Sequence, residues 1–167
     1  ALLEAIDTGR PISDALSVDA PNSARVIQWY AETIDKTYDE IAPAPRNALA
    51  MVTREPLGVI GAVVPWNYPM MITSWKLGPA LAMGNSIVVK PAENSSLSAL
   101  KMAELATAAG LPAGVFNVVP GLGSEAGQAL ARHMDVAKIA FTGSGPTGRK
   151  MMQYAAESNM KQVSLEL

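Results

Sequence analysis

The sequence predicts an α/β protein built on a parallel sheet, and three observations support that fold class. Short apolar runs rich in Val and Ile alternate with helical stretches from residue 59 onward. Gly, Pro or Asn separates successive elements. No internal repeat and no low-complexity tract interrupts this order. Such alternation is typical of βαβ units, so we expect a Rossmann-like parallel sheet with helices on both faces, preceded by a helical segment.

The composition excludes several classes of protein. The 167 residues carry 13 Lys and Arg against 15 Asp and Glu, a net charge of −2, which argues against a nucleic-acid partner. The absence of cysteine excludes a disulfide scaffold, a thiolate metal site and a cysteine nucleophile within the chain. The apolar segments are too short to span a bilayer, so no membrane partner is expected. No His or acidic cluster has metal-ligand spacing, so no metal site is expected either.

Both ends of the sequence look like interrupted elements. Residues 1–9 have the pattern of the last turns of a helix with Gly9 as its C-cap, and residues 161–167 have that of a strand with no turn after it. Nothing resembles a secretory signal. We therefore expect an internal fragment of a longer, cytoplasmic protein.

The N-terminal part is expected to be helical and then extended. The pattern predicts a helix from Asp19, as N-cap, to Ala42, because apolar residues recur at spacings of three and four. Prolines follow at positions 43 and 45, and two extended segments are expected at 48–54 and 57–64.

The regular part of the chain begins at residue 59. The expected strands are 59–64, 86–90, 115–119, 136–141 and 162–167. The expected helices are 70–82, 96–109, 124–133 and 146–157. His133, the only histidine, closes one of these helices and is interpreted as a partner of the helix dipole.

Four loops that follow expected strands form the candidate site, because ligands of open α/β sheets bind beyond the carboxyl ends of the strands. These loops are residues 65–69, 90–93, 120–124 and 142–148. The last one matches G-x-G-x-x-G, which suits a phosphate or forms only a tight turn. A P-loop is excluded, because Arg149 and Lys150 stand where it needs Lys and Ser or Thr.

Three places allow both a structural and a functional interpretation. Lys90 and Glu93 are either a solvated pair or a ribose clamp, whose carboxylate repels a 2′-phosphate and so favours NAD over NADP. Asn67 is either an Asx-turn residue or an amide donor to a developing oxyanion. Glu166 is either an outward-facing strand residue or a general base whose pKa is raised by burial.

Taken together, the ordered motifs resemble the aldehyde dehydrogenase family over essentially the whole chain. The motifs are EPLGV at 55–59, PWNYP at 65–69, KLGPALA at 76–82, GN at 84–85, KPAE at 90–93, GLPAGV at 110–115, FTGS at 141–144 and LEL at 165–167. The resemblance implies three parts. They are a helical part of the cofactor domain at 1–45, an oligomerisation β-hairpin segment at 46–58 and an NAD-binding α/β domain at 59–167, without the catalytic domain.

The resemblance also implies NAD-dependent oxidation of an aldehyde to a carboxylic acid through a cysteine thiohemiacetal and thioester. Asn67 would hold the oxyanion and Glu166 would activate water, while NAD is expected in preference to NADP. A homodimer or homotetramer is implied for the intact protein. The implied cofactor-binding residues are Pro65, Trp66, Asn67, Lys90, Glu93, Gly123, Phe141, Gly143, Ser144, Thr147 and Leu167.

Within the family, residues 29–36 and 158–161 look most like dehydrogenases of γ-glutamyl-γ-aminobutyraldehyde and other aminoaldehydes. The family's cysteine follows the glutamate by a few tens of residues, and this chain holds none, so the chain itself is expected to be inactive. A non-catalytic dinucleotide-binding module is the alternative. A different Rossmann-type reductase is weaker, because no Tyr/Lys or His group is suitably placed for hydride transfer.

Overall fold

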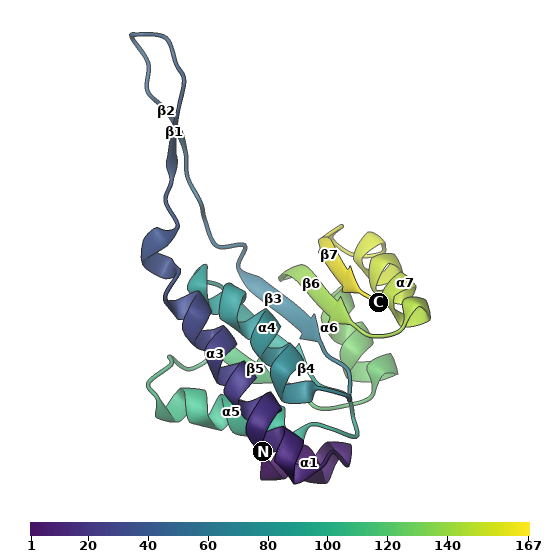
Figure 1. Cartoon of the computed structure of the whole chain (residues 1–167). Coiled ribbons are helices and arrows are strands. Elements are labelled where there is room, and N and C mark those ends of the chain that lie inside the picture. Colours follow the sequence, from purple (N-terminus) through teal and green to yellow (C-terminus); the bar gives the residue numbers. More distant parts are fainter.

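The computed structural model describes residues 1–167 and contains a five-stranded parallel sheet with helices on both faces (Figure 1). A two-stranded ribbon stands away from this body. The main-sheet strands are β3 (Val59–Val63), β4 (Ser86–Lys90), β5 (Phe116–Val118), β6 (Val136–Thr142) and β7 (Gln162–Glu166). The predicted fold class is confirmed, and each strand lies within one residue of its expected bounds.

The strand order is β5-β4-β3-β6-β7, so the chain builds the sheet outward from β3 in both directions. It moves first through β4 to β5 and then crosses back to place β6 on the other side of β3. The position between β3 and β6 is therefore a topological switch point, where open α/β sheets bind their ligands. Val63 pairs with Lys90 on one side and Phe141 on the other, so the loops after these strands start at one level.

Four helices cover the main sheet, and each follows a strand. They are α4 (Pro69–Ala82), α5 (Leu97–Ala108), α6 (Gln128–Arg132), which follows a π-helical turn η3 (Gly123–Gly127), and α7 (Gly145–Ala156). Helices α4 and α5 share one core with Ile60 and Ala62 of β3, whereas α6 and α7 share the other with Val63. Between these layers, a Cβ on Gly61 would lie 2.6 Å from the Ile139 side chain. The central strand is thus buried on both faces.

The N-terminal segment packs on the α4 side of the sheet. Its elements are α1 (Leu2–Thr8), α2 (Ile12–Asp14), a π-helical turn η1 (Ala15–Asp19) and α3 (Ala20–Ala31). Gly9 ends α1 with φ of +72°, as the sequence predicts. Helix α3 approaches α4 so closely that a Cβ on Gly78 would lie 2.5 Å from the Tyr30 ring.

Helix α3 begins after Asp19, as expected, but ends at Ala31 and not at Ala42. Asp19 has helical backbone angles and no capping hydrogen bond, because its carboxylate pairs with Arg10 instead. At the other end the α-helix stops at Ala31, and Ile41, which continues the apolar period, is 77% exposed. Beyond Ala31 the apolar stripe faces no core in this chain, so nothing stabilises further helical turns.

The residues after α3 leave the body of the molecule. A 3₁₀ turn, η2 (Ile34–Lys36), leads into β1 (Glu40–Ala42), which pairs antiparallel with β2 (Ala50–Val52). This pairing starts before residue 46, inside the segment that was expected to be helical. The division of the chain into 1–45, 46–58 and 59–167 stays a prediction. None of the helices combines the length and the apolar character needed to cross a membrane.

Candidate functional site

The four candidate loops follow β3, β4, β5 and β6, so the parallel strands bring them to one edge of the sheet. Glu166, the last residue of β7, lies at the same edge, because it pairs with Thr142 at the end of β6. This carboxyl edge therefore gathers the expected oxyanion donor, the expected base and the expected cofactor loops around the switch point.

Lys90 and Glu93 form a fixed amine–carboxylate pair. Lys90 Nζ lies 3.1 Å from Glu93 Oε2, and the Lys90 side chain is only 4% exposed whereas that of Glu93 is 55% exposed. A hydrogen bond from its own backbone N–H and a second one from Lys90 lower the pKa of Glu93. The interpretation as a solvated pair is wrong for Lys90, because its side chain is buried, and a Cβ on Gly127 would lie 4.0 Å from Lys90 Cδ. The pair presents an ionised carboxylate outward.

The loop after β6 ends at Ser144, the N-cap residue of α7. Ser144 Oγ donates to Thr147 Oγ1 at 3.0 Å, so two expected cofactor residues are linked at a helix N-terminus. Phe141 is buried beneath this loop rather than open at its surface, and a Cβ on Gly143 would lie 2.7 Å from its ring. Glycine thus lets the backbone lie flat on the aromatic ring just before the helix begins.

The loop after β3 exposes Trp66 and Asn67 and leaves Pro65 half-buried. Asn67 Oδ1 accepts a hydrogen bond from the Tyr68 backbone N–H at 3.1 Å. This contact joins adjacent residues, so it is not the Asx turn of the structural interpretation, in which the side-chain oxygen accepts from the N–H two residues on. It leaves Asn67 Nδ2 free to donate to another group.

The Glu166 carboxylate lies between a hydroxyl and an amine. Thr142 Oγ1 donates to Glu166 Oε2 at 2.9 Å, and Lys76 Nζ lies 3.9 Å from the same oxygen. The Glu166 side chain is 57% exposed, so the burial expected of it is not present in this chain. The physical reason is that β7 is an edge strand with no further strand beside it.

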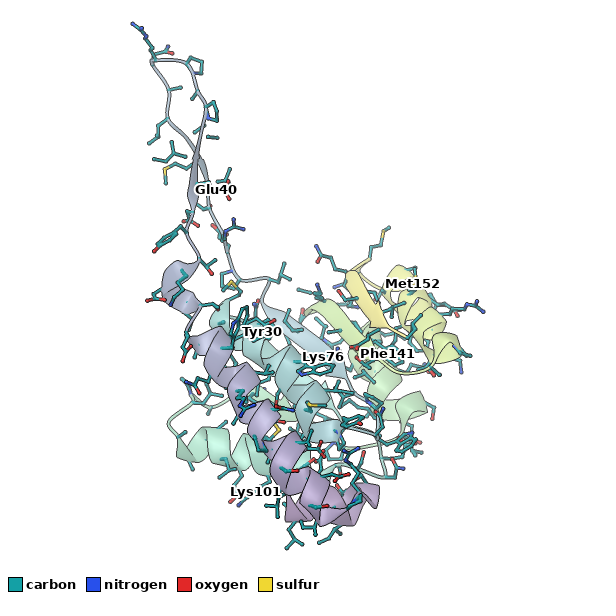
Figure 2. All side chains as sticks on the ribbon, in the orientation of Figure 1. Tyr30, Glu40, Lys76, Lys101, Phe141 and Met152 are labelled. Atoms are coloured by element: carbon teal, nitrogen blue, oxygen red, sulfur yellow. The ribbon has the colours of Figure 1, made fainter.

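Lys76 is a site residue that the sequence interpretation missed. It lies on α4, on the side facing β6 and β7 (Figure 2), and its side chain is 12% exposed. Burial lowers the pKa of Lys76, and the charge of Glu166 opposes that effect. A signal was present in the sequence, because Lys76 is the only charged residue among positions 69–82.

The remaining expected cofactor residues lie at the margins of the edge. Gly123 begins the π-helical turn before α6, and a Cβ there would meet nothing within 4 Å. Leu167 packs against α7, where a Cβ on Gly148 would lie 2.7 Å from its side chain. A hollow of about 830 Å³ lies near the base of the ribbon. Of the candidate-site residues described above, only Lys76 lines it.

Comparison with known proteins identifies relatives of this chain by sequence. The model of the aldehyde dehydrogenase family matches residues 1–167. The NADP/NAD-dependent aldehyde dehydrogenase PuuC of Escherichia coli (strain K12) is 59% identical over 166 residues, which are 99% of this chain and 34% of that protein. The aminoacetaldehyde dehydrogenase of Pseudomonas aeruginosa is 57% identical with the same coverage. The chain thus spans about a third of the length of these curated relatives.

Solved structures of aldehyde dehydrogenases have the same fold as this chain. An indole-3-acetaldehyde dehydrogenase in complex with NAD⁺ superposes with a TM-score of 0.97 at 57% identity, over 99% of this chain and 33% of that one. A γ-glutamyl-γ-aminobutyraldehyde dehydrogenase from Burkholderia cenocepacia J2315 gives the same TM-score and identity over 99% of this chain and 34% of that one. Both the family match and the aminoaldehyde relatives agree with the expected resemblance. The chain belongs to the aldehyde dehydrogenase family.

Proposed function

We propose that the chain is the cofactor-binding part of an NAD-dependent aldehyde dehydrogenase, whose cysteine nucleophile lies outside these 167 residues. The observation that carries the proposal is the carboxyl edge of the sheet. It gathers the free Asn67 amide, the Glu166 carboxylate, the Lys90–Glu93 pair and the N-terminus of α7 around one switch point.

The residues at this edge fit a dinucleotide. The first turn of α7 has backbone N–H groups without intrahelical partners and the positive end of the helix dipole, which suit a pyrophosphate. Gly143 and Ser144 bring the backbone close to that position. On the other side of β3, Lys90 and Glu93 offer a donor and an acceptor to ribose hydroxyls. NAD, when bound, would supply the hydride acceptor.

The chain's own residues support two steps of aldehyde oxidation. Asn67 Nδ2 donates to the oxygen that gains negative charge when a thiolate attacks the aldehyde carbon. Glu166 accepts a proton from the water that releases the carboxylic acid. Thr142 and Lys76 hold the Glu166 carboxylate at the carboxyl edge of the sheet.

The two roles are tested in the full-length enzyme by separating acylation from deacylation. Asn67→Ala is expected to slow the acylation step by about 10²–10³-fold, the loss typical of a missing oxyanion donor. Glu166→Gln is expected to leave the first turnover fast and to slow thioester release. Unchanged rates for both steps in both variants would refute the assigned roles.

Preference for NAD over NADP follows from the Glu93 carboxylate, which repels a 2′-phosphate. The lowered pKa of Glu93 supports this, because the carboxylate keeps its charge at neutral pH. Titration of both cofactors is expected to give a lower Kd for NAD, and Glu93→Gln is expected to narrow the difference. A lower Kd for NADP than for NAD in the unmodified protein would contradict the ribose role of Glu93.

The substrate proposed is an aminoaldehyde. The support comes from the names of similar proteins, an aminoacetaldehyde dehydrogenase and a γ-glutamyl-γ-aminobutyraldehyde dehydrogenase. A higher kcat/KM for aminoaldehydes than for uncharged aldehydes of the same length is the expected result. Equal values for both would remove this part of the proposal.

A non-catalytic dinucleotide-binding module is the second candidate, and the absence of cysteine favours it. Calorimetry with NAD and turnover with aldehyde separate the two candidates. Binding heat without any aldehyde-dependent NADH in the full-length protein would support the module, whereas turnover excludes it.

A further inference from the structure

The loop between β3 and α4 carries Asn67, and the N-terminal segment of the chain holds this loop from one side. Figure 1 shows α1 beside the start of α4. Two side chains of the segment reach the loop and the helix start, namely Glu4 of α1 and Arg10, which follows α1. They contact Met70 and Tyr68, so both contacts fall within three residues of Asn67.

Arg10 lies over the residue next to Asn67. Its guanidinium carbon is 4.3 Å from the centre of the Tyr68 ring, a cation–π arrangement. Asp19, which is completely buried, fixes the guanidinium through an ion pair of 2.8 Å between Asp19 Oδ2 and Arg10 Nε. The stacked ring in turn belongs to the residue whose backbone N–H donates to Asn67 Oδ1.

Glu4 supplies a cap that α4 lacks. Tyr68 occupies the N-cap position without a capping side-chain bond, and Pro69 follows it. The carboxylate of Glu4 accepts a hydrogen bond from the Met70 backbone N–H at 3.2 Å, one of the N–H groups that a helix start leaves without a partner. It also lies at the positive end of the α4 dipole. Glu4 of α1 therefore fixes the first turn of α4 through the Met70 N–H.

Stability alone is a weak reason for this arrangement. Glu4 and Asp19 are both completely buried, and Glu4 Oε2 and Asp19 Oδ1 have no hydrogen-bond partner. Removing charged oxygens from water without full compensation costs free energy. The contacts instead converge on one short loop, which is the loop that presents Asn67.

We propose that Glu4, Arg10 and Asp19, the loop clamp, are positioning residues that hold the Asn67 amide in the orientation that the oxyanion requires. The clamp acts through Tyr68 and the first turn of α4 and does not touch the reacting atoms. This inference rests on the proposed role of Asn67, and the experiment below separates the two.

The first variant replaces both members of the ion pair, Arg10→Met with Asp19→Asn, so that no buried charge is left without a partner. The full-length enzyme is expected to lose about tenfold in single-turnover NADH formation, while the KM for NAD changes less than twofold. The chain offers a matched control, because Arg132 stacks on Tyr154 at 4.8 Å and pairs with Glu157 away from the carboxyl edge. Arg132→Met with Glu157→Gln is expected to leave the single-turnover rate unchanged.

The same clamp variant in an Asn67→Ala background tests whether the effect passes through Asn67. A clamp that acts on Asn67 is expected to lose its effect there, with less than a twofold further decrease. An equal decrease in both backgrounds, or no decrease in the first, overturns the inference. If Asn67→Ala alone leaves acylation unchanged, the proposed function fails instead, and the inference fails with it.

Glu4 provides a second test that does not depend on the ion pair. Glu4→Gln keeps an oxygen that accepts the Met70 N–H and is expected to retain at least half of the acylation rate. Glu4→Met removes the acceptor and is expected to lower that rate about fivefold with an unchanged KM for NAD. Equal acylation rates for these two variants overturn the role of Glu4, whether both are fast or both are slow.

Discussion

Glu4 shows at the scale of one residue how burial and hydrogen bonding compete. Burial raises the pKa of Glu4 from its ordinary value of 4.5, and the nearby Ser98 side chain and the hydrogen bond from the Met70 N–H oppose the rise. A raised folded-state pKa means that folding favours the protonated carboxyl. Its contribution to stability is therefore complete below the unfolded pKa and is lost as pH rises through the folded pKa.

Glu4→Gln removes this titration while keeping the acceptor for Met70. The Tm of the variant, relative to that of the unmodified protein, is expected to increase between pH 4 and pH 7.5, because only the unmodified protein loses stability as Glu4 ionises. Thermal unfolding at both pH values measures it. Glu125→Gln, at an exposed position, is the control and should follow the unmodified protein. A decreasing difference would contradict the raised pKa.

Met160 is the only residue other than glycine with a positive φ, at 58°. This left-handed conformation is unfavourable for a residue with a side chain, and Met160 is 83% exposed, so no packing compensates. Met160→Gly is expected to raise the free energy of unfolding by roughly 0.5–1 kcal/mol, as measured by chemical denaturation. Met134→Gly, at an exposed position without positive φ, should instead lower it. Destabilisation by both variants would show that no strain resides at Met160.

At the scale of elements, the β1–β2 ribbon is the least buried part of the fold. Ile41 pairs directly with Met51, and these apolar side chains are 77% and 59% exposed. Directly opposed residues of an antiparallel pair share one face, so the ribbon presents an apolar stripe without a partner in this chain. We propose that this stripe joins subunits of the intact protein, in line with the oligomerisation hairpin and the homodimer or homotetramer that the family resemblance implies.

Lysine at both positions, Ile41→Lys with Met51→Lys, should weaken such an assembly. The full-length protein is expected to sediment as a smaller species at micromolar concentration, because two charges would be buried without partners. Sedimentation velocity gives the mass. Glu40→Lys with Val52→Lys, on the opposite face of the ribbon, is the control. An unchanged mass for the first variant would exclude this face from the interface.

At the scale of the whole molecule, the two-way growth of the sheet from β3 determines where a ligand can bind. Residues distant in sequence, such as Asn67 and Glu166, reach one edge only because parallel strands end at the same level. The opposite edge carries turns such as Gly84 and Met160 and none of the expected cofactor residues. We therefore predict that NAD protects backbone N–H groups from exchange at the carboxyl edge and not at the amino edge.

Amide hydrogen exchange with and without NAD tests this difference in the full-length protein. Protection is expected at 90–93 and 143–148, because bound cofactor shields these backbone N–H groups. The amino edge, at 84–85 and 158–161, should exchange at an unchanged rate and serves as the internal control. Protection confined to the amino edge would contradict the binding position.

Much of this architecture could be predicted from the sequence. The strands from residue 59 onward, and helices α4, α5 and α7, lie within one residue of their expected bounds, because local periodicity and Gly or Pro at the boundaries agree with the fold. The helix expected at 124–133 is divided into the π-helical turn η3 and the α-helix α6, which begins only at Gln128. The prediction of a helix beyond Ala31 was wrong, because periodicity indicates an apolar face without indicating whether a core lies opposite that face. Ile34, Tyr38 and Ile41 keep the helical spacing and yet stand exposed.

The candidate site divides in the same way. Asn67, Lys90, Glu93 and Glu166 could be chosen as candidates from the sequence because each follows or ends a strand, and strand ends are local features of a sequence. Lys76 was missed because it reaches Glu166 from a helix ninety residues earlier in the chain. The exposure of Glu166 was missed for a related reason, since it depends on β7 being an edge strand.

The sequence by itself determined the α/β class, the positions of most elements from residue 59 onward and the family to which the chain belongs, since these depend on short-range patterns and ordered motifs. Only the tertiary structure decided which distant groups meet. It buried Lys90 against Glu93, placed Lys76 beside Glu166, and set Glu4, Arg10 and Asp19 around the Asn67 loop. The physical reason is that burial and charge pairing depend on the distance between atoms in space, which chain spacing does not fix.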